Sequence, residues 1–412
     1  MAALELRSPS RSELREFFGP VMSGFGLDST DDDFRFEELT YEEGRSVGAL
    51  DEGVWVGGSG AYSFDVTVPG GAQVAASGIT MVGVAPTHRR RGILTSMMRW
   101  LHEDAVRRGE PLALLTASES SIYRRFGYGV ATDIARVSVP SRAVTFDPPL
   151  RVEGGFRRVD LHADTSVLER VYDQVRLCRP GWFNRNDGWW ARLRLDPTAA
   201  RDGASKLFAA VHEDAAGVPD GFATWRIAEG HADDRVAAAT VVIDELVAID
   251  TDVELAIWQF LANIDLATTL SWNGAPVDLP LRSRLVEPRQ LHQRGRSDWA
   301  WARLLDVPAA LAARRYPVAG DLVLQVDDAF RPASGGTFRL KGSPDGAECE
   351  RVDDARPDLV LGAPELGAIY LGGNAASLLG AVDRIVERSP GALARADAMF
   401  VTHPAPHCPL MF

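Results

Sequence analysis

The segment from Val82 to Leu94, VGVAPTHRRRGIL, holds the residues best suited to chemistry in this chain. An apolar strand pattern precedes it and an apolar helical pattern follows it, so three arginines and Gly92 fall in the turn that opens a helix. Free backbone amides, the positive end of a helix dipole and guanidinium groups attract anions, and glycine lets a ligand approach the backbone closely. We therefore expect a pyrophosphate cradle here. The alternative is a basic surface turn that binds nothing.

A second candidate group lies between Ala117 and Gly129, ASESSIYRRFGYG. The apolar run that ends at Ala117 predicts a buried strand, and Ser118 is expected to cap a short helix that carries Tyr123. A tyrosine, with an ordinary pKa of ~10, is able to donate a proton to a departing thiolate. The alternative is that Tyr123 serves only as an aromatic residue of the core.

These groups need a scaffold, and 412 residues are enough for about two to four domains. Proline-bearing joints divide the chain into three blocks, which we place at 1–149, 150–291 and 292–412. Block one alternates helix and strand patterns, with helices expected at 12–23 and 93–106 and strands at 46–50, 54–64, 74–84 and 111–117.

Block two repeats this outline without the basic turn. A strand from Ala237 to Ile249 leads to Thr251-x-x-Glu254, which predicts a capping box at the start of a helix. Block three predicts a helix at 307–314, strands at 321–326, 337–340 and 357–362, and two helices, one from Glu365 and one from Asn374 to Val386 with Leu378, Leu379 and Val382 on one face.

The charge is unevenly distributed. The net charge is -13, and the 25 residues from Asp28 to Glu52 hold ten acids against two arginines. This field argues against a nucleic-acid partner and favours cationic ligands; the alternative is an acidic face that only keeps the protein solvated. The two lysines, Lys206 and Lys341, do not stand in a phosphate-binding GK[ST] motif, which excludes a P-loop.

Several other classes are excluded. The longest apolar runs fall well short of the ~20 residues of a membrane span, and no apolar signal region follows the N-terminus, so we expect a cytoplasmic protein. The three cysteines form no CxxC pair, as is usual in a reducing compartment. We expect no metal site, because three prolines interrupt the spacing of His403, His407 and Cys408.

The two candidate segments carry a resemblance to known enzymes. Arg89-x-x-Gly92 between strand and helix resembles the acetyl-CoA motif of the GNAT N-acetyltransferases, Q/R-x-x-G-x-G/A, although Leu94 replaces the last small residue. VAPTHRRRG and ASESSIYRRFGYG together are similar to the Eis (enhanced intracellular survival) acetyltransferase family. The resemblance implies a mixed α/β chain: two tandem GNAT-type folds, the second degenerate, then a sterol-carrier-protein-like α/β domain.

The resemblance also implies acetyl-CoA as co-substrate and a role for particular residues. Tyr123 matches the family's general acid, and the terminal carboxylate of Phe412 matches its general base. Because such a carboxylate has an ordinary pKa of ~3.3–3.7, it serves as base only in a dry site or through a water, and otherwise as an anchor for a cation. The residues implied to hold acetyl-CoA are Val82 and Val84 for the pantetheine, Arg89, Arg90, Gly92 and Ile93 for the pyrophosphate, and Ser118 and Glu119 near the thioester.

The expected function is therefore acetyl transfer to amines of a polycationic substrate, such as an aminoglycoside-like molecule or a lysine side chain. The resemblance suggests acetylation at several positions and a homo-hexamer, and it places Asp28, Phe36 and Met81 in the amine pocket. Two alternatives remain: a lipid or small-molecule carrier whose GNAT folds are scaffolds, and a regulatory protein that senses acetyl-CoA without turnover.

Overall fold

The computed structural model describes residues 4–27, 30–230 and 238–412. The chain divides into two compact units. Unit 1 comprises residues 1–132, 180–184 and 298–412, and unit 2 comprises residues 133–179 and 185–297. Each unit therefore gathers segments from distant parts of the chain.

The first sheet of unit 1 has seven strands in the order β1-β2-β3-β4-β5-β14-β6. The strand β14 comes from the start of block three, yet it pairs antiparallel with both β5 and β6. All five residues of β14 are buried, so the strand lies inside the first fold. The strands are β1 (Glu5–Arg7), β2 (Ser46–Asp51), β3 (Val54–Thr67), β4 (Gln73–Val84), β5 (Leu112–Thr116), β6 (Gly129–Val130) and β14 (Ala300–Leu304).

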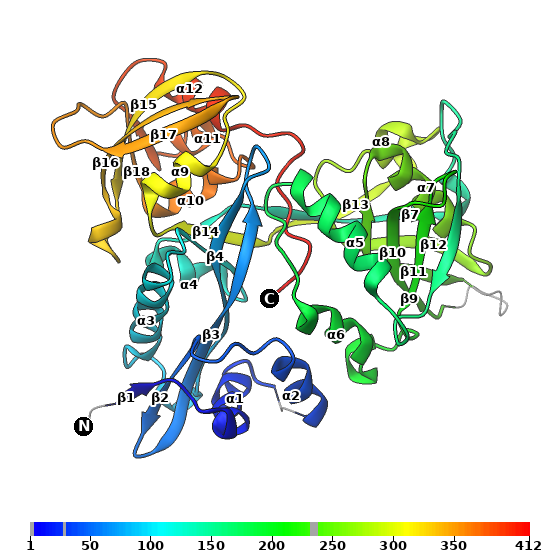
Figure 1. Cartoon of the computed structure of the whole chain (residues 1–412), viewed down its shortest axis with the longest axis horizontal. Helices are drawn as coiled ribbons and strands as arrows, with labels where there is room; N and C mark the ends of the chain where they lie inside the picture. The colour runs from blue at the N-terminus through cyan, green and yellow to red at the C-terminus, as the bar shows by residue number, and fades with distance from the viewer. Residues whose placement is uncertain (1–3, 28–29, 231–237) are drawn as a thin grey trace. The chain divides into compact units, whose positions relative to one another are not determined.

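Helices cover both faces of this sheet. Alternation along β2 divides its side chains: Leu50 joins the cluster under helix α1, whereas Val47 and Ala49 join the cluster under helix α3. Helix α3 buries Met97 and Leu101 along one stripe, as its apolar spacing predicts. The helices are α1 (Leu14–Gly24), α2 (Asp31–Glu38), α3 (Ile93–Arg107) and α4 (Ser120–Tyr123) (Figure 1).

The rest of unit 1 is a five-stranded sheet in the order β17-β16-β15-β18-β19 with four helices. The helix predicted from Asn374 to Val386 is wrong in length: α11 ends at Gly380, and strand β19 follows and pairs with β18. The strands and helices are β15 (Gly320–Asp327), β16 (Gly336–Ser343), β17 (Gly346–Arg351), β18 (Leu359–Gly362), β19 (Ile385–Glu387), α9 (Val307–Ala313), α10 (Ala363–Tyr370), α11 (Ala376–Gly380) and α12 (Ala392–Phe400).

The predicted apolar face of that helix is also wrong. Leu378 is 61% exposed on α11, and Val382, which lies in the turn after this helix, is 58% exposed.

Unit 2 contains a second seven-stranded sheet in the order β13-β7-β12-β11-β10-β9-β8. Its strand β7 precedes the predicted joint at 149/150 and pairs antiparallel with β12. The two block boundaries, 149/150 and 291/292, themselves remain predictions. The strands and helices are β7 (Asp133–Pro140), β8 (Gly155–Val159), β9 (Phe208–Glu213), β10 (Pro219–Ala228), β11 (Ala239–Ala248), β12 (Ala267–Ala275), β13 (His292–Asp298), α5 (Ser166–Val175), α6 (Asp187–Leu195), α7 (Thr251–Ala262) and α8 (Leu281–Arg284).

Helix α7 begins differently from the prediction. Its N-cap is Asp250, whose carboxylate accepts a hydrogen bond of 2.9 Å from the amide of Val253, so the capping box at Thr251 is wrong by one residue. Glu254 is consequently free of a capping role. The expected strand before this helix is confirmed over β11, while Ala237 lies outside the described residues.

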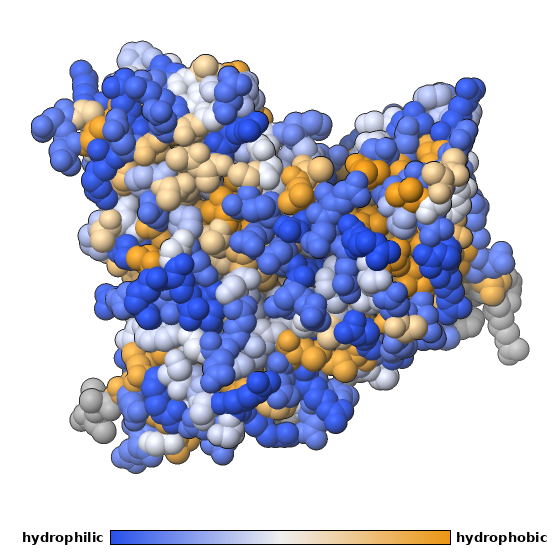
Figure 2. Space-filling model, viewed as in Figure 1, coloured by the Kyte–Doolittle hydropathy of each residue, from blue (hydrophilic) through white to orange (hydrophobic). Residues whose placement is uncertain are grey.

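Hydrophilic residues cover much of the face shown in Figure 2, with apolar patches between them. Among the described residues, no helix has both the length and the apolar character needed to cross a bilayer.

Candidate active site

Strands β4 and β5 create an opening in the first sheet. They pair in parallel from Ala76 with Leu112 to Ile79 with Leu115, but β4 continues to Val84. Within the described chain, the last residues of β4 have a strand partner only on the β3 side. Their other edge offers free backbone amides and carbonyls, to which an extended amide chain is able to bond as an added strand.

Met81 lies where the register of β4 against β3 shifts, between the pairs Gly60–Thr80 and Gly58–Gly83. Its φ of 52° lies in the left-handed region, which is uncommon for a residue with a side chain and stores backbone strain. Such strain is frequent at functional sites.

A cleft of about 780 Å³ opens beside this strand edge. It lies entirely in unit 1, between the end of β4, the start of α3 and helix α4. The structure thus brings to one cleft Tyr123 and all eight residues expected to hold acetyl-CoA: Val82, Val84, Arg89, Arg90, Gly92, Ile93, Ser118 and Glu119.

The turn before α3 aims the helix N-terminus into the cleft. Gly92 is the N-cap with φ 84°, and its carbonyl accepts the first hydrogen bond of the helix from Ser96, 3.0 Å long. The amides of the first turn therefore have no acceptor within the helix. Fifteen aligned residues of α3 add a positive potential at this end.

The three arginines of the turn are not equivalent. Arg89 donates a hydrogen bond of 2.8 Å to the carbonyl of Gly24 at the end of α1, and Arg91 donates one of 3.1 Å to Asp51. Arg90, with φ 62°, lines the cleft and makes no hydrogen bond or ion pair with any residue in the described parts of the chain. Arg90 is thus the guanidinium available to an anion.

His88 supports the same turn. Its Nε2 lies 3.0 Å from the carboxylate of Asp51, and the Thr87 hydroxyl bonds to its Nδ1 at 2.8 Å. The hydrogen bond from His88, followed by that from Arg91, holds the pKa of Asp51 below its ordinary value. His88 therefore holds the turn in place through Asp51 and Thr87.

Several residues that line the cleft were not expected from the sequence, among them Gly24 and Phe25 at the end of α1. Arg125 and Thr95 line it as well. The run Arg124-Arg125 signals basic character, but only the structure shows that Arg124 turns away to pair with Glu365 of α10 while Arg125 lines the cleft.

Tyr123 closes the other end of the cleft from helix α4. The residue is 5% exposed, and burial raises the pKa of its hydroxyl to about 12, partly offset by a hydrogen bond with Ser118. The N-cap of α4 is Glu119, not Ser118 as expected. Ser118 instead adjoins the Tyr123 hydroxyl, which stays protonated at neutral pH and is available as a donor.

Phe412 ends the chain, whose end is marked C in Figure 1, and lies against Phe64 of β3, Gly78 of β4 and Thr116 of β5. Its ring makes edge contacts with Phe64 and Phe183 at centroid distances of 5.0 and 5.5 Å. Its carboxyl oxygen accepts a hydrogen bond of 2.7 Å from the hydroxyl of Thr116, the last residue of β5. The carboxyl therefore lies at the edge of the sheet where β4 and β5 diverge.

The expected substrate residues are less well gathered. Phe36 lies half-buried on α2 and Met81 lies on β4, and neither lines the cleft; Asp28 lies outside the described residues. Part of the acidic stretch serves the fold, because Thr30 and Asp33 form the capping box of α2. Among the described residues, no group of three or more His, Cys, Asp or Glu could hold a metal ion.

The chain matches three known domain families. Residues 5–131 and 181–315 match two families described as acetyltransferase (GNAT) domains, and residues 307–409 match the sterol carrier protein domain. These matches confirm the predicted fold class of two tandem GNAT folds and a sterol-carrier-like domain.

Relatives cover the whole chain. An uncharacterized N-acetyltransferase of Streptomyces coelicolor is 41% identical over 98% of this chain and 99% of its own length. N-acetyltransferase Eis of Mycobacterium tuberculosis is 35% identical over 82% of this chain and 81% of its own. The crystal structure of Eis1 from Mycobacterium abscessus superposes with a TM-score of 0.86 over 100% of both chains, at 32% identity.

Proposed function

Because this chain belongs to the Eis family of GNAT N-acetyltransferases, we propose that it acetylates amines of polycationic molecules, at more than one position, directly from acetyl-CoA. That it is an acetyltransferase follows from its family and its GNAT domains. The observation that best supports the finer proposal is the single cleft that joins the Arg90 turn, the free edge of β4 and Tyr123.

The residues present fit acetyl-CoA, which supplies an activated acetyl group as a thioester. The free edge at Val82 and Val84 suits the amides of pantetheine, and the amides of the first turn of α3 with Arg90 suit the pyrophosphate. The absence of any partner for Arg90 among described residues supports its assignment as an anion-binding group.

Tyr123 supplies the proton for the departing thiolate. With a pKa of about 12 the hydroxyl is a weaker acid than an ordinary tyrosine, so it gives up its proton only as negative charge builds on the sulfur. Until then it acts as a hydrogen-bond donor of fixed position.

Phe412 supplies the negative charge for the amine. Its carboxyl group, held by Thr116, is suited to anchor a protonated amine and, through a water, to accept the proton that the amine must lose before it attacks. The excess of acids over arginines between Asp28 and Glu52, ten against two, supports a preference for cationic substrates.

The test is release of free thiol from acetyl-CoA in the presence of a polyamine, an aminoglycoside, a lysine-containing peptide or a neutral polyol. We expect release with the cationic amines and none with the polyol. Saturable binding of acetyl-CoA without thiol release from any amine would contradict the proposal and identify a sensor. The homo-hexamer is part of the proposal and is checked by native mass spectrometry.

A further inference from the structure

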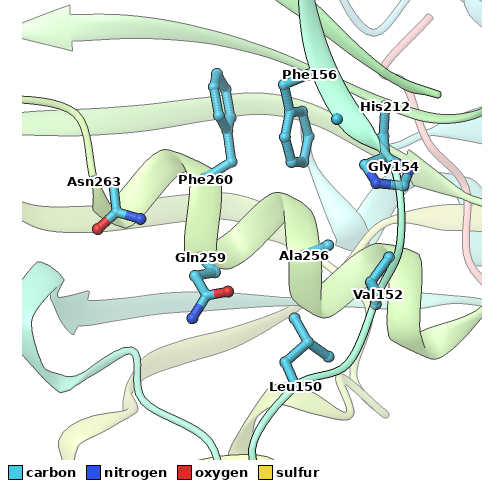
Figure 3. Close-up of a pocket in the computed structure, with 10 residues that line it drawn as sticks. Leu150, Val152, Gly154, Phe156, His212, Ala256, Gln259, Phe260 and Asn263 are labelled. Carbon is cyan, nitrogen blue, oxygen red and sulfur yellow. The ribbon is translucent and has the colours of Figure 1, made fainter. Parts of the chain in front are cut away.

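A second cavity lies in unit 2, far along the chain from the cleft just described. It has a volume of about 270 Å³ and opens between helix α7 and the segment that leads into β8 (Figure 3). It shares no lining residue with the acetyl-CoA cleft. Its walls are formed by Leu150, Val152, Gly154, Gly155, Phe156, His212, Ala256, Gln259, Phe260 and Asn263.

The register of two strands builds one wall. Phe156 of β8 is paired directly with His212 of β9, so both side chains point to the same face of the sheet. The ring of Phe156 stacks on Phe260 of α7 at 4.2 Å with an interplanar angle of 14°, and Phe260 in turn meets Trp225 edge-on at 5.7 Å. This aromatic row fixes the wall before any ligand binds.

His212 is the chemically distinctive group of the cavity. The residue is 2% exposed, and its Nδ1 lies 2.6 Å from the carboxylate of Asp220. A carboxylate oxygen only accepts hydrogen bonds, so the hydrogen of this bond belongs to Nδ1, and an imidazole protonated at Nδ1 alone has Nε2 as an acceptor. No described residue bonds to Nε2. A buried imidazole oriented by an acid, with its other nitrogen unoccupied in the wall of a cavity, is an arrangement for holding a hydrogen-bond donor.

The remaining lining restricts the charge of the occupant. None of the ten lining residues is an Asp, Glu, Lys or Arg. The polar groups besides His212 are the amides of Gln259 and Asn263 on α7, shown in Figure 3. Burying a charged ligand here would leave its charge unpaired, whereas a neutral ring with one donor would satisfy Nε2.

From this geometry we propose that unit 2 binds a small, uncharged aromatic molecule of one or two rings that donates one ring N–H or hydroxyl hydrogen to Nε2 of His212. The cavity volume of about 270 Å³ lies just below the range of about 300–1,000 Å³ that is typical of pockets for drug-sized ligands. The cavity therefore has room for a molecule of no more than two rings. This site is additional to acetyl transfer and lies in the fold that has no basic turn.

Fluorine NMR of the full chain tests the proposal with 5-fluoroindole as the probe, in the presence of saturating acetyl-CoA. We expect saturable binding, and at least fivefold weaker binding of 5-fluorobenzothiophene, which has the same shape but no N–H. Ala256→Leu should fill the cavity and weaken probe binding at least tenfold. Asp252→Leu, which adds the same side chain at an exposed position of α7, should leave binding unchanged.

His212→Phe is the second variant, because it keeps an aromatic ring and removes the acceptor. It should bring the affinity for 5-fluoroindole down to that for 5-fluorobenzothiophene. Circular dichroism verifies that each variant is folded. The proposal is overturned if 5-fluoroindole does not saturate, if acetyl-CoA displaces it, if both probes bind the wild type equally, or if folded Ala256→Leu and His212→Phe bind it as the wild type does.

Discussion

The hydroxyl of Thr116 and the carboxyl of Phe412, 296 residues apart in sequence, are joined by a hydrogen bond of 2.7 Å. Thr116 ends β5, at the edge where β4 and β5 separate, so this bond fixes the last residue at the opening of the sheet. A terminus without such a contact would fray in solvent.

Thr116→Val removes this hydrogen bond and keeps the shape of the side chain. One hydrogen bond to a charged group is worth about 1.5–3 kcal/mol, so we expect kcat to fall roughly tenfold or more, with the Kd for acetyl-CoA unchanged. Steady-state kinetics and calorimetry measure the two quantities. An unchanged kcat would show that the position of Phe412 does not matter for turnover.

Adding one glycine after Phe412 tests the carboxyl itself, because it moves the charge by ~3.5 Å while all side chains remain. We expect loss of most activity toward polyamines in the same thiol-release assay. If the extended enzyme were fully active, the carboxyl group would have no role in turnover, and Phe412 would contribute only its packing against Phe64.

Arg90→Ala should weaken acetyl-CoA binding about tenfold, since it removes the guanidinium that lines the cleft without a described partner. Arg91→Ala is the matched control: its guanidinium is engaged by Asp51, and we expect a much smaller loss. Titration calorimetry at low salt compares them. Equal losses would mean that the turn acts only through its total charge.

Tyr123→Phe should lower kcat by about 100-fold and leave the Kd for acetyl-CoA within twofold, as for the loss of a general acid. Because burial raises the pKa of Tyr123 to about 12, the phenol keeps its proton up to that pH. The wild-type kcat should therefore show no fall from tyrosine ionisation between pH 7 and 10. An alkaline limb in that range that disappears in Tyr123→Phe would contradict the assignment.

Glu254→Gln should stabilise the protein above neutral pH. Burial raises the pKa of Glu254 to about 7 from its ordinary 4.5, so the folded state binds more protons than the unfolded state between these values. Wild-type stability therefore falls as pH rises through this window, and the neutral amide avoids the loss. We expect the Tm of the variant to exceed that of the wild type by a few degrees at pH 8 and by much less at pH 5. Asp252→Asn, at an exposed acid of the same turn, is the control.

The residues expected around acetyl-CoA lie together in one cleft, because the parts of that cleft are local in the sequence. The Arg89–Gly92 turn and Tyr123 each lie in one short run whose strand and helix patterns are clear. What failed was the choice between neighbouring N-cap residues: Asp250 and not Thr251 caps α7, and Glu119 and not Ser118 caps α4.

Long-range pairing could not be predicted. The pattern of residues 300–304 predicts a buried strand equally well in any sheet, and nothing local specifies that it belongs between β5 and β6. The predicted length of α11 was wrong for a related reason, since the strand that follows this helix forms only because β18 offers an edge for pairing.

The insertion of β14 affects the order in which the chain can fold during synthesis. On a ribosome the first sheet stays incomplete until residue 304 has emerged, by which time the whole segment of unit 2 is already outside. A fragment that stops at residue 149 would leave the edges of β5 and β6 unpaired and prone to pair with other chains. The first fold is therefore completed only by a strand that is translated after unit 2.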